Sequence, residues 1–363
     1  MLKVAMIVRS TLYTSRGGDT IQAMQTARML RRQGINVDII LTDEKIEYRK
    51  YNLLHFFNIT RPADILHHVG QTDKPYVVST ILVDYSEYDK HHRKGFSGIA
   101  LKYFDADTIE YIKSIGRWLR RSDRLMSIPY VWKGQKKAII EIMKKATLLL
   151  PNSAAEYGKL KKQYNCSTQY MVVPNGIDED LFAFDKSMEK DPRLVLCVAR
   201  IEGVKNQMTL IRALNDTGYT LIIIGEPSPN QMRYYNACRK MASGNIHFIG
   251  HLPQKELVHY YQRAKVHVLP SWFETTGLSS LEGAAMGCSI VVTDKGFTKA
   301  YFGNHAVYCD PSSAESIYAA VKNASLLPNN EKLRSQIRTF YTWRQAGLCT
   351  AEGYKRVINE SWD

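Results

Sequence analysis

The sequence lacks any apolar run that could cross a bilayer, since no stretch of its 363 residues approaches the roughly 20 apolar residues of a transmembrane helix. The apolar stretch within Met1–Arg9 is too short for a signal peptide and has no small-residue cleavage site, so we expect a buried strand there. Hydrophobic content of 45% and charged content of 23% are ordinary for a globular protein. We therefore expect a cytoplasmic protein.

Cysteine is scarce, and no two cysteines form a C-x-x-C pair or show the spacing of a zinc site. The six cysteines, most of them in apolar segments, are Cys166, Cys197, Cys238, Cys288, Cys309 and Cys349. We expect reduced cysteines in the core of a cytosolic protein.

Acidic residues are too few to balance the basic ones: 49 Lys and Arg against 35 Asp and Glu leave a net charge of +14. Residues 90–145 carry fourteen Lys and Arg against five Asp and Glu. The basic and aromatic residues that cluster there are Lys113, Arg117, Trp118, Arg120, Arg121, Arg124, Trp132, Lys133, Lys136 and Lys137. Such a mixture is compatible with a solvated helical face, an anionic membrane surface or an anionic acceptor. Nucleic acid is disfavoured because no nucleic-acid motif accompanies the charge.

Length and periodicity indicate two α/β domains, because about 150 residues form a typical domain. In the first half we expect strands at Val4–Val8, Ile35–Leu41, Leu53–Phe57, Pro75–Ser79 and Ala146–Pro151. Ile21, Met24, Ala27 and Leu30 predict the buried face of a helix that stops at Gly34, after a glycine turn at Gly17-Gly18. Residues 85–135 are expected to form inserted helices and loops.

In the second half of the chain, predicted strands and helices alternate more regularly. We expect strands at Arg193–Ala199, Tyr219–Gly225, Asn245–Gly250, Val266–Pro270 and Cys288–Asp294. Helices are expected at Gln207–Leu214, Asn230–Met241, Pro253–Ala264, Leu278–Met286, Ser313–Ser325, Glu331–Tyr341 and Arg344–Ile358. This order predicts a second doubly wound domain, whose ligands lie at the carboxyl ends of its strands.

The segment Pro270–Gly287 follows a strand and opens a helix. Gly277 lets the backbone approach a ligand, and the helix N-terminus favours an anion such as a diphosphate. Glu274 and Glu282, eight positions apart, are suited to accept hydrogen bonds from sugar hydroxyls. The alternative is that Glu274 is a surface acid and Glu282 a partner of the helix dipole.

The loop Val198–Asn206 also follows a strand. Its Arg200 and Lys205 are suited to bind phosphate, and the alternative is two solvated charges. Both loops are expected at one sheet edge, where cations, a helix N-terminus and two carboxylates together describe a nucleotide-sugar site.

These segments resemble a known family. Glu274 to Glu282 resembles the E-x7-E signature of the retaining glycosyltransferases of family 4, which adopt the GT-B fold. Arg200 and Lys205 resemble its Arg/Lys pair, Val173–Asp178 its interdomain V-P-N-G-I-D motif, and Gly17-Gly18 its glycine-rich loop. The resemblance covers nearly the whole chain and is most specific over residues 172–294.

The resemblance implies two doubly wound Rossmann-like parallel-sheet domains facing across a cleft. An acceptor-binding domain would span residues 1–173, with the helix at 341–363 crossing back onto it, and a donor-binding domain would span 174–340. Arg200 and Lys205 would hold the donor diphosphate, Glu274 the sugar and Glu282 the ribose. The backbone near Gly250, His251 and Leu252 would meet the nucleobase, and the N–H groups near Gly277 and Leu278 would meet the diphosphate. Gly18 would approach the phosphate or the reacting sugar from the other domain, with Gly17 on the acceptor side.

The implied activity is metal-independent, cofactor-free, retaining transfer of a hexose or N-acetylhexosamine from a nucleotide-diphosphate sugar, with UDP- or GDP-sugars favoured. The acceptor would be a glycan or a polyprenyl-diphosphate-linked sugar in cell-surface polysaccharide or glycan biosynthesis, with peripheral contact of residues 90–145 to an anionic membrane. The alternative is a non-catalytic nucleotide-sugar-binding or scaffold protein on the same fold.

One segment departs from the family. Where many relatives carry a T-x-H-D-like stretch, this chain has Ser79–Tyr85, which lacks the histidine but keeps Asp84. Asp84 is suited either to contact a sugar, as an acceptor-side residue like Gly17, or to cap a helix or turn. Similarly, Ser153 and Glu156 form a capping-box pattern, with a contribution of Asn152, Ser153 and Glu156 to the floor of the cleft as the alternative.

Overall fold

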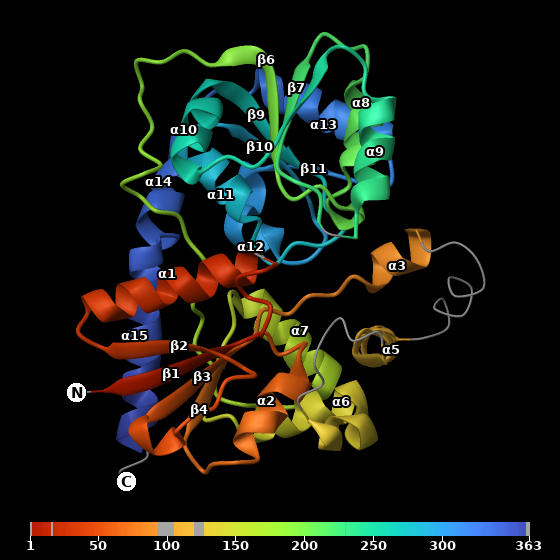
Figure 1. Ribbon diagram of the computed structural model, residues 1–363. Coiled ribbons are helices and arrows are strands. Elements are labelled where there is room, and N and C mark those ends of the chain that lie inside the picture. The colour runs from red at the N-terminus through yellow and green to blue at the C-terminus, as the bar shows by residue number, and fades with distance from the viewer. Residues whose placement is uncertain (1, 16, 93–104, 120–126, 229, 361–363) are drawn as a thin grey trace. The chain divides into compact units, whose positions relative to one another are not determined.

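The computed structural model describes residues 2–15, 17–92, 105–119, 127–228 and 230–360 (Figure 1). The chain divides into two compact units: Met1–Asn175 with Trp343–Asp363, called here the N-terminal unit, and Gly176–Thr342, called the C-terminal unit. Each unit contains one sheet whose strands all pair in parallel. Each is therefore an α/β unit of the kind that the alternating sequence pattern predicts.

The N-terminal sheet has the strand order β2-β1-β3-β4-β5 among the described residues. Its strands are β1 (Lys3–Val8), β2 (Asn36–Leu41), β3 (Leu53–Phe57), β4 (Tyr76–Ser79) and β5 (Leu148–Leu150). Numbered within the unit, this is the 2-1-3-4-5 order of a doubly wound fold. The order reverses between β1 and β3, so the loops after those strands border the switch point.

Helices cover both faces of this sheet. They are α1 (Gly18–Arg32), α2 (Pro62–Val69), α3 (Ser86–His92), α5 (Ala106–Leu119), α6 (Ile128–Lys145), α7 (Ala154–Tyr164) and α15 (Trp343–Glu360), with a 3-10 turn η1 (Tyr48–Lys50). The side chains of β3 alternate between the layers. His55 bonds the hydroxyl of Tyr354 in α15, at 2.7 Å, while the Phe56 ring lies 6.0 Å from that of His68 in α2.

The last helix belongs to the N-terminal unit. α15 packs so closely on α1 that a Cβ at Gly347 would lie 2.4 Å from the Cβ of Met29 (Figure 1). Only a glycine permits this approach. α15 is thus part of the core of the first unit.

The predicted face of α1 is wrong in its first two positions. Ile21 and Met24 are exposed by 37% and 45%, whereas Ala23, Ala27 and Leu30 are buried. An α-helix turns once per ~3.6 residues, so positions nine apart, such as Ile21 and Leu30, lie on opposite sides. A strict three-residue spacing therefore drifts around the helix. The Gly17-Gly18 turn is also revised, since Gly18 is already the first residue of α1.

The C-terminal sheet has the strand order β11-β10-β9-β6-β7-β8 among the described residues. Its strands are β6 (Asp191–Val198), β7 (Thr220–Ile224), β8 (Ile246–Ile249), β9 (Ala264–Leu269), β10 (Ser289–Thr293) and β11 (Val307–Cys309). Numbered within the unit, this is the 3-2-1-4-5-6 Rossmann order. The order reverses between β6 and β9, which places the switch point, where such folds bind ligands, between the loops that follow these two strands.

The helices of this unit are α8 (Gln207–Leu214), α9 (Met232–Met241), α10 (Gln254–Arg263), α11 (Leu278–Ala285), α12 (Thr298–Phe302), α13 (Ala314–Leu326) and α14 (Glu331–Phe340). Two 3-10 turns, η2 (Gly203–Lys205) and η3 (Gly303–His305), complete it. The sequence missed α12 and β11. Five and three residues are too few to show a helical or a strand period.

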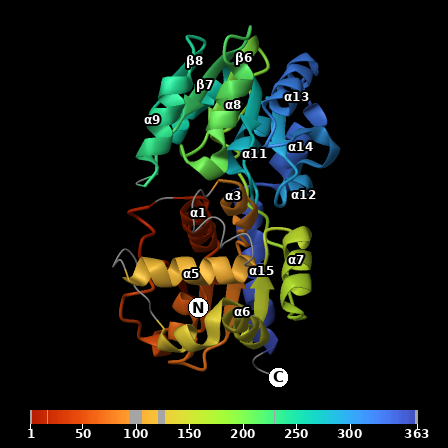
Figure 2. The same cartoon turned by 90° about the vertical axis from the view of Figure 1, so that its right-hand side faces the viewer.

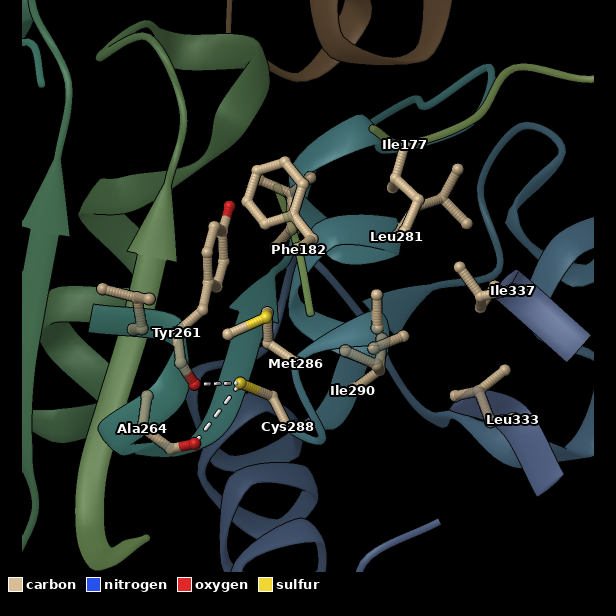
Figure 3. Packing of buried hydrophobic residues seen from close by; sticks show 14 of the residues in the cluster. Ile177, Phe182, Tyr261, Ala264, Leu281, Met286, Cys288, Ile290, Leu333 and Ile337 are labelled. Carbon is tan, nitrogen blue, oxygen red and sulfur yellow. Dashed lines mark hydrogen bonds between the residues drawn. The ribbon is translucent and has the colours of Figure 1, made fainter. Parts of the chain in front are cut away.

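The strand side chains pack into two hydrophobic clusters, one on each face of the sheet. Leu194 and Leu196 face a cluster with α10, α11 and α14, whereas Val195 and Cys197 face a cluster with α8, α9 and α13. Figure 3 shows the first cluster, in which Tyr261, Leu281 and Met286 pack together. All six cysteines are free, and all but Cys349 are buried, as expected from the sequence.

Two further predictions concern residues 85–135 and membrane spans. α3, α5 and α6 supply the helices expected in that region, and α5 lies against α6 (Figure 2), where the Tyr111 hydroxyl donates to Val131 O at 2.7 Å. Of the basic cluster, Arg120, Arg121 and Arg124 lie outside the described residues. No helix in the described ranges is long and apolar enough to span a membrane.

Candidate functional site

An ion pair joins the two loops at the switch point of the C-terminal sheet. Lys205 Nζ, after β6, lies 2.6 Å from Glu274 Oε1, after β9, and the two side chains are exposed by 18% and 9%. A pair this shielded from water is weakly screened. The sequence predicted each residue at a sheet edge, and the structure brings these two together.

Hydrogen bonds to neighbouring loops hold the loop after β6 in place. Asn206 adopts a left-handed conformation with φ 62°, and its side-chain amide donates to Pro270 O at 3.1 Å and Pro311 O at 2.7 Å. The Trp272 N–H donates to Val204 O at 2.9 Å. Lys205 is thereby held against the loop after β9 by backbone as well as by charge. Sequence reasoning missed Asn206, although an asparagine directly before a helix is a common signal of a special turn.

Arg200 has a different partner from Lys205. Its guanidinium, 42% exposed, donates to Glu202 Oε1 at 3.0 Å, and the other carboxylate oxygen of Glu202 accepts from the Ser228 hydroxyl at 2.8 Å. The expected Arg/Lys pair thus consists of an exposed cation, Arg200, and a partly buried one, Lys205. Arg200 has donors left for an incoming anion, because a guanidinium carries five.

Gly296 shapes the loop that holds Glu274. The Phe297 N–H donates to Glu274 O at 2.9 Å, and a Cβ at Gly296 would lie 2.1 Å from that same oxygen. Its φ of 87° also lies in the left-handed region. Gly296 is therefore required for the loop after β10 to pack on Glu274. Sequence reasoning missed it; its only signal is a glycine shortly after a strand.

Glu282 is a buried carboxylate in α11. It accepts a hydrogen bond from the Tyr261 hydroxyl at 2.9 Å and one from Gln254 Nε2 at 3.0 Å, both from α10. Burial raises the pKa of Glu282 to about 7, against the lowering effect of these two donors. Glu282 is not a surface dipole partner, and Glu274, at 7% exposure, is not a surface acid. No local pattern in the sequence indicates Gln254 or Tyr261 as partners of Glu282.

The N-terminus of α11 lies between the two glutamates in sequence. Gly277 precedes the helix with φ 79°, a conformation that favours glycine, and Leu278 is the first helical residue. The first N–H groups of a helix have no partner within it. Nearby, the buried hydroxyls of Ser271 and Ser280 have no hydrogen-bond partner among the described residues. Buried polar groups are rarely unsatisfied, so this segment is suited to a bound ligand or water.

The expected nucleobase segment lies at the same edge of the sheet. Gly250, His251 and Leu252 follow β8, and the first two are exposed. A Cβ at Gly250 would meet nothing within 4 Å, so the fold itself does not require a glycine there. Gly250 has no side chain, so its exposure is that of backbone available for polar contacts.

Gly17 and Gly18 start α1 in the N-terminal unit. Gly17 has extended backbone, φ −148°, which any residue adopts. Arg9 fixes the loop before it, donating to Asp19 Oδ2 at 2.6 Å, Ser15 O at 2.6 Å and Thr11 O at 2.8 Å. The roles of Gly18 toward the donor and of Gly17 on the acceptor side remain predictions.

Asp84 acts as a cap. Its Oδ1 accepts from the Ser86 N–H at 3.0 Å and hydroxyl at 2.6 Å at the start of α3, and its Oδ2 lies 2.8 Å from Lys159 Nζ. The capping interpretation is thus confirmed, and contact with a sugar remains a prediction. The capping-box interpretation is half correct, because Ser153 Oγ accepts from the Glu156 N–H at 3.1 Å. The Glu156 carboxylate does not bond back to the Ser153 N–H. It accepts hydrogen bonds from the Asn152 N–H at 2.9 Å and from the Leu82 N–H, in the segment after β4, at 2.8 Å.

Comparison with known proteins matches the C-terminal unit to a family. Residues 178–340 match the family model described as Glycosyl transferases group 1. Glycogen synthase of Mycobacterium tuberculosis is 30% identical over 196 residues, which cover 50% of this chain and 47% of that protein. The chain spans about half the length of such curated relatives.

Solved structures match over nearly the whole chain. Sucrose-phosphate synthase of Thermosynechococcus elongatus gives a TM-score of 0.78 at 16% identity, covering 99% of this chain and 100% of that one. HepE of Anabaena, in complex with UDP-glucose, gives 0.70 at 13% identity, covering 98% and 100%. The chain therefore has the two Rossmann-like parallel-sheet units of the GT-B fold, and its C-terminal unit matches the group 1 glycosyltransferases over almost its whole length.

Proposed function

We propose that this protein is a retaining, metal-independent glycosyltransferase. It moves a hexose or N-acetylhexosamine from a nucleotide-diphosphate sugar, a UDP- or GDP-sugar first, to a glycan or polyprenyl-diphosphate-linked acceptor. The observation that carries this proposal is the Lys205–Glu274 pair across the switch point, beside the N-terminus of α11 and the buried Glu282. The UDP-glucose bound by a protein of the same fold and the name of the glycogen synthase relative both support it.

The donor site is built from groups of matching charge. Arg200, Lys205 and the N-terminus of α11 attract the diphosphate. The Glu282 carboxylate accepts hydrogen bonds from the ribose hydroxyls, displacing or sharing Gln254. Glu274 contacts the sugar while balancing Lys205, and the backbone after β8 meets the base. Every one of these groups lies at the carboxyl edge of a single sheet.

The chemistry follows from where charge develops. The bond between the sugar C1 and the diphosphate oxygen breaks, and a bond from the acceptor hydroxyl oxygen to C1 forms. Negative charge grows on the diphosphate, where Lys205 and Arg200 stabilise it without rearranging. The departing phosphate takes the acceptor proton on the same face, so stereochemistry is retained and no protein nucleophile is needed.

The acceptor belongs to the basic N-terminal unit. Ile128 and Trp132 in α6 are exposed by 75% and 85%, and Trp118 in α5 by 44%. Lys136 and Lys137, which follow the kink in α6 at Gly134, are exposed as well. Exposed tryptophan beside lysine suits the interface of an anionic membrane. We therefore place the enzyme at the cytoplasmic face of a membrane, acting on a lipid-linked acceptor.

Thermal stabilisation by a panel of UDP-, GDP-, ADP- and TDP-sugars tests donor binding. A ligand at 100 times its Kd stabilises the folded state by ~2.7 kcal/mol. One nucleotide class should raise the melting temperature, and both Glu282→Ala and Arg200→Ala should abolish the increase. Glu256→Ala, which removes an exposed acid of α10, is the matched control and should keep it.

Release of free nucleotide in the presence of the bound donor then separates an enzyme from a scaffold. Binding without turnover against a panel of glycan and lipid-linked acceptors would favour the non-catalytic alternative. Absence of any stabilisation at millimolar donor would refute nucleotide-sugar binding itself.

A further inference from the structure

A strained residue lies directly after β4 in the N-terminal unit. Ile81 has φ 42°, in the left-handed region, although it is β-branched and 5% exposed. A β-branched side chain in this region is a genuine outlier and persists only where its surroundings over-determine it. Such strain clusters at functional sites, so the contacts that maintain it identify what the segment is built to do.

A buried carboxylate spans this residue. Glu156 of α7, with no exposed surface, accepts hydrogen bonds from the Thr80 hydroxyl and from the Leu82 N–H, the latter at 2.8 Å. Thr80 and Leu82 are the two neighbours of Ile81. A third bond comes from the Asn152 N–H at 2.9 Å. Burial raises the pKa of Glu156, and these three donors offset that cost.

The same segment is tied to the rest of the sheet edge. The Ile59 N–H, in the loop after β3, donates to Thr80 O at 2.8 Å. Asn152, after β5, accepts from Gln22 of α1 at 2.9 Å. The hydrogen bonds of Glu156, Thr80 and Asn152 therefore connect the loops after β3, β4 and β5. These loops lie at the carboxyl edge of the N-terminal sheet, where doubly wound folds bind ligands.

The strain sets the direction of the residues that follow. Ile81 and Leu82 are buried, whereas Val83, Asp84 and Tyr85 are partly exposed. Lys159, three positions after Glu156 on α7, holds the Asp84 carboxylate at 2.8 Å. One face of α7 thus fixes both the buried start and the accessible end of this segment, called here the β4 segment (residues 80–86).

We propose that Glu156 is a positioning residue for the acceptor: by holding Ile81 in its strained conformation, it keeps the β4 segment in place as a wall that binds acceptor sugar hydroxyls. This inference rests on the proposed function. The nucleotide donor is assigned to the other unit, so the loss of Glu156 is expected to affect acceptor use and to leave donor binding unchanged.

Glu156→Gln tests this directly, because the amide has the same shape but turns a donor toward the Asn152 N–H. The measurements are the KM for a farnesyl-diphosphate-linked sugar, the kcat for UDP-glucose hydrolysis by water, and the Kd for UDP. We expect the acceptor KM to rise at least about tenfold, the effect of one lost hydrogen bond to a buried carboxylate. The hydrolysis rate and the Kd should stay within about twofold of the wild type.

Tyr76→Phe is the matched control. It removes a buried hydrogen bond to Ile142 O at 2.9 Å from the opposite end of the same strand. It should lower stability without changing the acceptor KM. Ile81→Gly supplies the rescue, because glycine adopts positive φ at no steric cost. Combined with Glu156→Gln, it should return the acceptor KM most of the way to the wild-type value.

The outcomes separate this inference from the proposed function. Transfer by the wild type with an unchanged KM in Glu156→Gln, or an equal rise in Tyr76→Phe, overturns the positioning role alone. No transfer by the wild type overturns the proposed function and this inference with it. If Glu156→Gln does not fold, Lys159→Met releases Asp84 at the accessible end of the β4 segment, and an unchanged acceptor KM in that variant overturns the proposal.

Discussion

The buried Glu282 is predicted to make the stability of the C-terminal unit fall as pH rises from about 4.5 to about 7. Its pKa is about 7 in the folded protein and close to the ordinary 4.5 in the unfolded chain. In this window the folded protein holds a proton that the unfolded chain releases, so raising the pH favours unfolding. Below about pH 4.5 the free energy of unfolding keeps its full value, and above about pH 7 the whole contribution of Glu282 is lost.

The magnitude follows from the same shift. A carboxyl whose pKa rises from 4.5 to about 7 binds its proton more tightly on folding by ~3 kcal/mol. Glu282→Gln keeps the shape and hydrogen-bonding oxygen but removes the charge. We expect the variant to match the wild type near pH 4.5 and to exceed it by ~3 kcal/mol at pH 8.

Chemical denaturation at a series of pH values measures this difference. Glu256→Gln, an exposed acid of the neighbouring helix α10, is the control and should follow the wild type throughout. A difference between Glu282→Gln and wild type that does not change with pH would refute the reasoning. It would mean that Glu282 has the same pKa in the folded and the unfolded chain, so that Tyr261 and Gln254 fully compensate its burial.

Donor affinity should move in the opposite direction. Only the ionised carboxylate can accept hydrogen bonds from two ribose hydroxyls at once. Binding of UDP-glucose, whose diphosphate does not titrate in this range, should therefore strengthen as pH rises through about 7. Glu282→Gln should bind weakly at every pH, which calorimetry can establish.

Three other predictions follow from the site and the basic surface. Lys205→Ala leaves Glu274 charged and buried without its ion-pair partner. The free energy of unfolding should therefore fall by ~3 kcal/mol, and turnover should fall by at least about 100-fold. Adding Glu274→Gln to this variant should restore stability but not turnover. Gly296→Ala forces a Cβ to 2.1 Å from Glu274 O and should lower both the melting temperature and donor affinity, while Gly244→Ala, whose Cβ meets nothing within 4 Å, should change neither. Trp132→Ser removes an 85% exposed aromatic ring and should reduce co-sedimentation with anionic vesicles; equal pelleting of variant and wild type would contradict membrane contact through α6.

Much of the fold was accessible from the sequence because it depends on local pattern. The isoleucine-rich run before Gly225 and the apolar run at Leu53–Phe57 predicted β7 and β3, since short apolar segments bounded by turn residues form buried strands. The α1 face was misassigned because three-residue spacing follows the helix only for about two turns. β11 was missed because three residues carry no period.

The candidate site divides along the same line. Lys205, Glu274 and Glu282 were found because each lies in or next to a loop that follows a strand, a position that the chain order alone reveals. Their partners were not. Tyr261 contacts Glu282 from 21 positions away, and Gly296 meets Glu274 from 22 positions away across another loop. No local pattern carries such contacts.

The sequence by itself determined most of the strands and helices, though not α12 and β11. It also determined that the chain folds as two α/β units and which loops carry charge. These properties follow from the period of apolar side chains and from turn residues, which act over a few positions. Only the tertiary structure decided that Lys205 forms an ion pair with Glu274 and that Glu282 is buried enough for its pKa to rise to about 7. It also decided that the Glu156 carboxylate binds the two neighbours of the strained Ile81 instead of closing a capping box. Burial and pairing depend on how elements distant in the chain pack, and a carboxylate in water and one in a core have the same letter in the sequence.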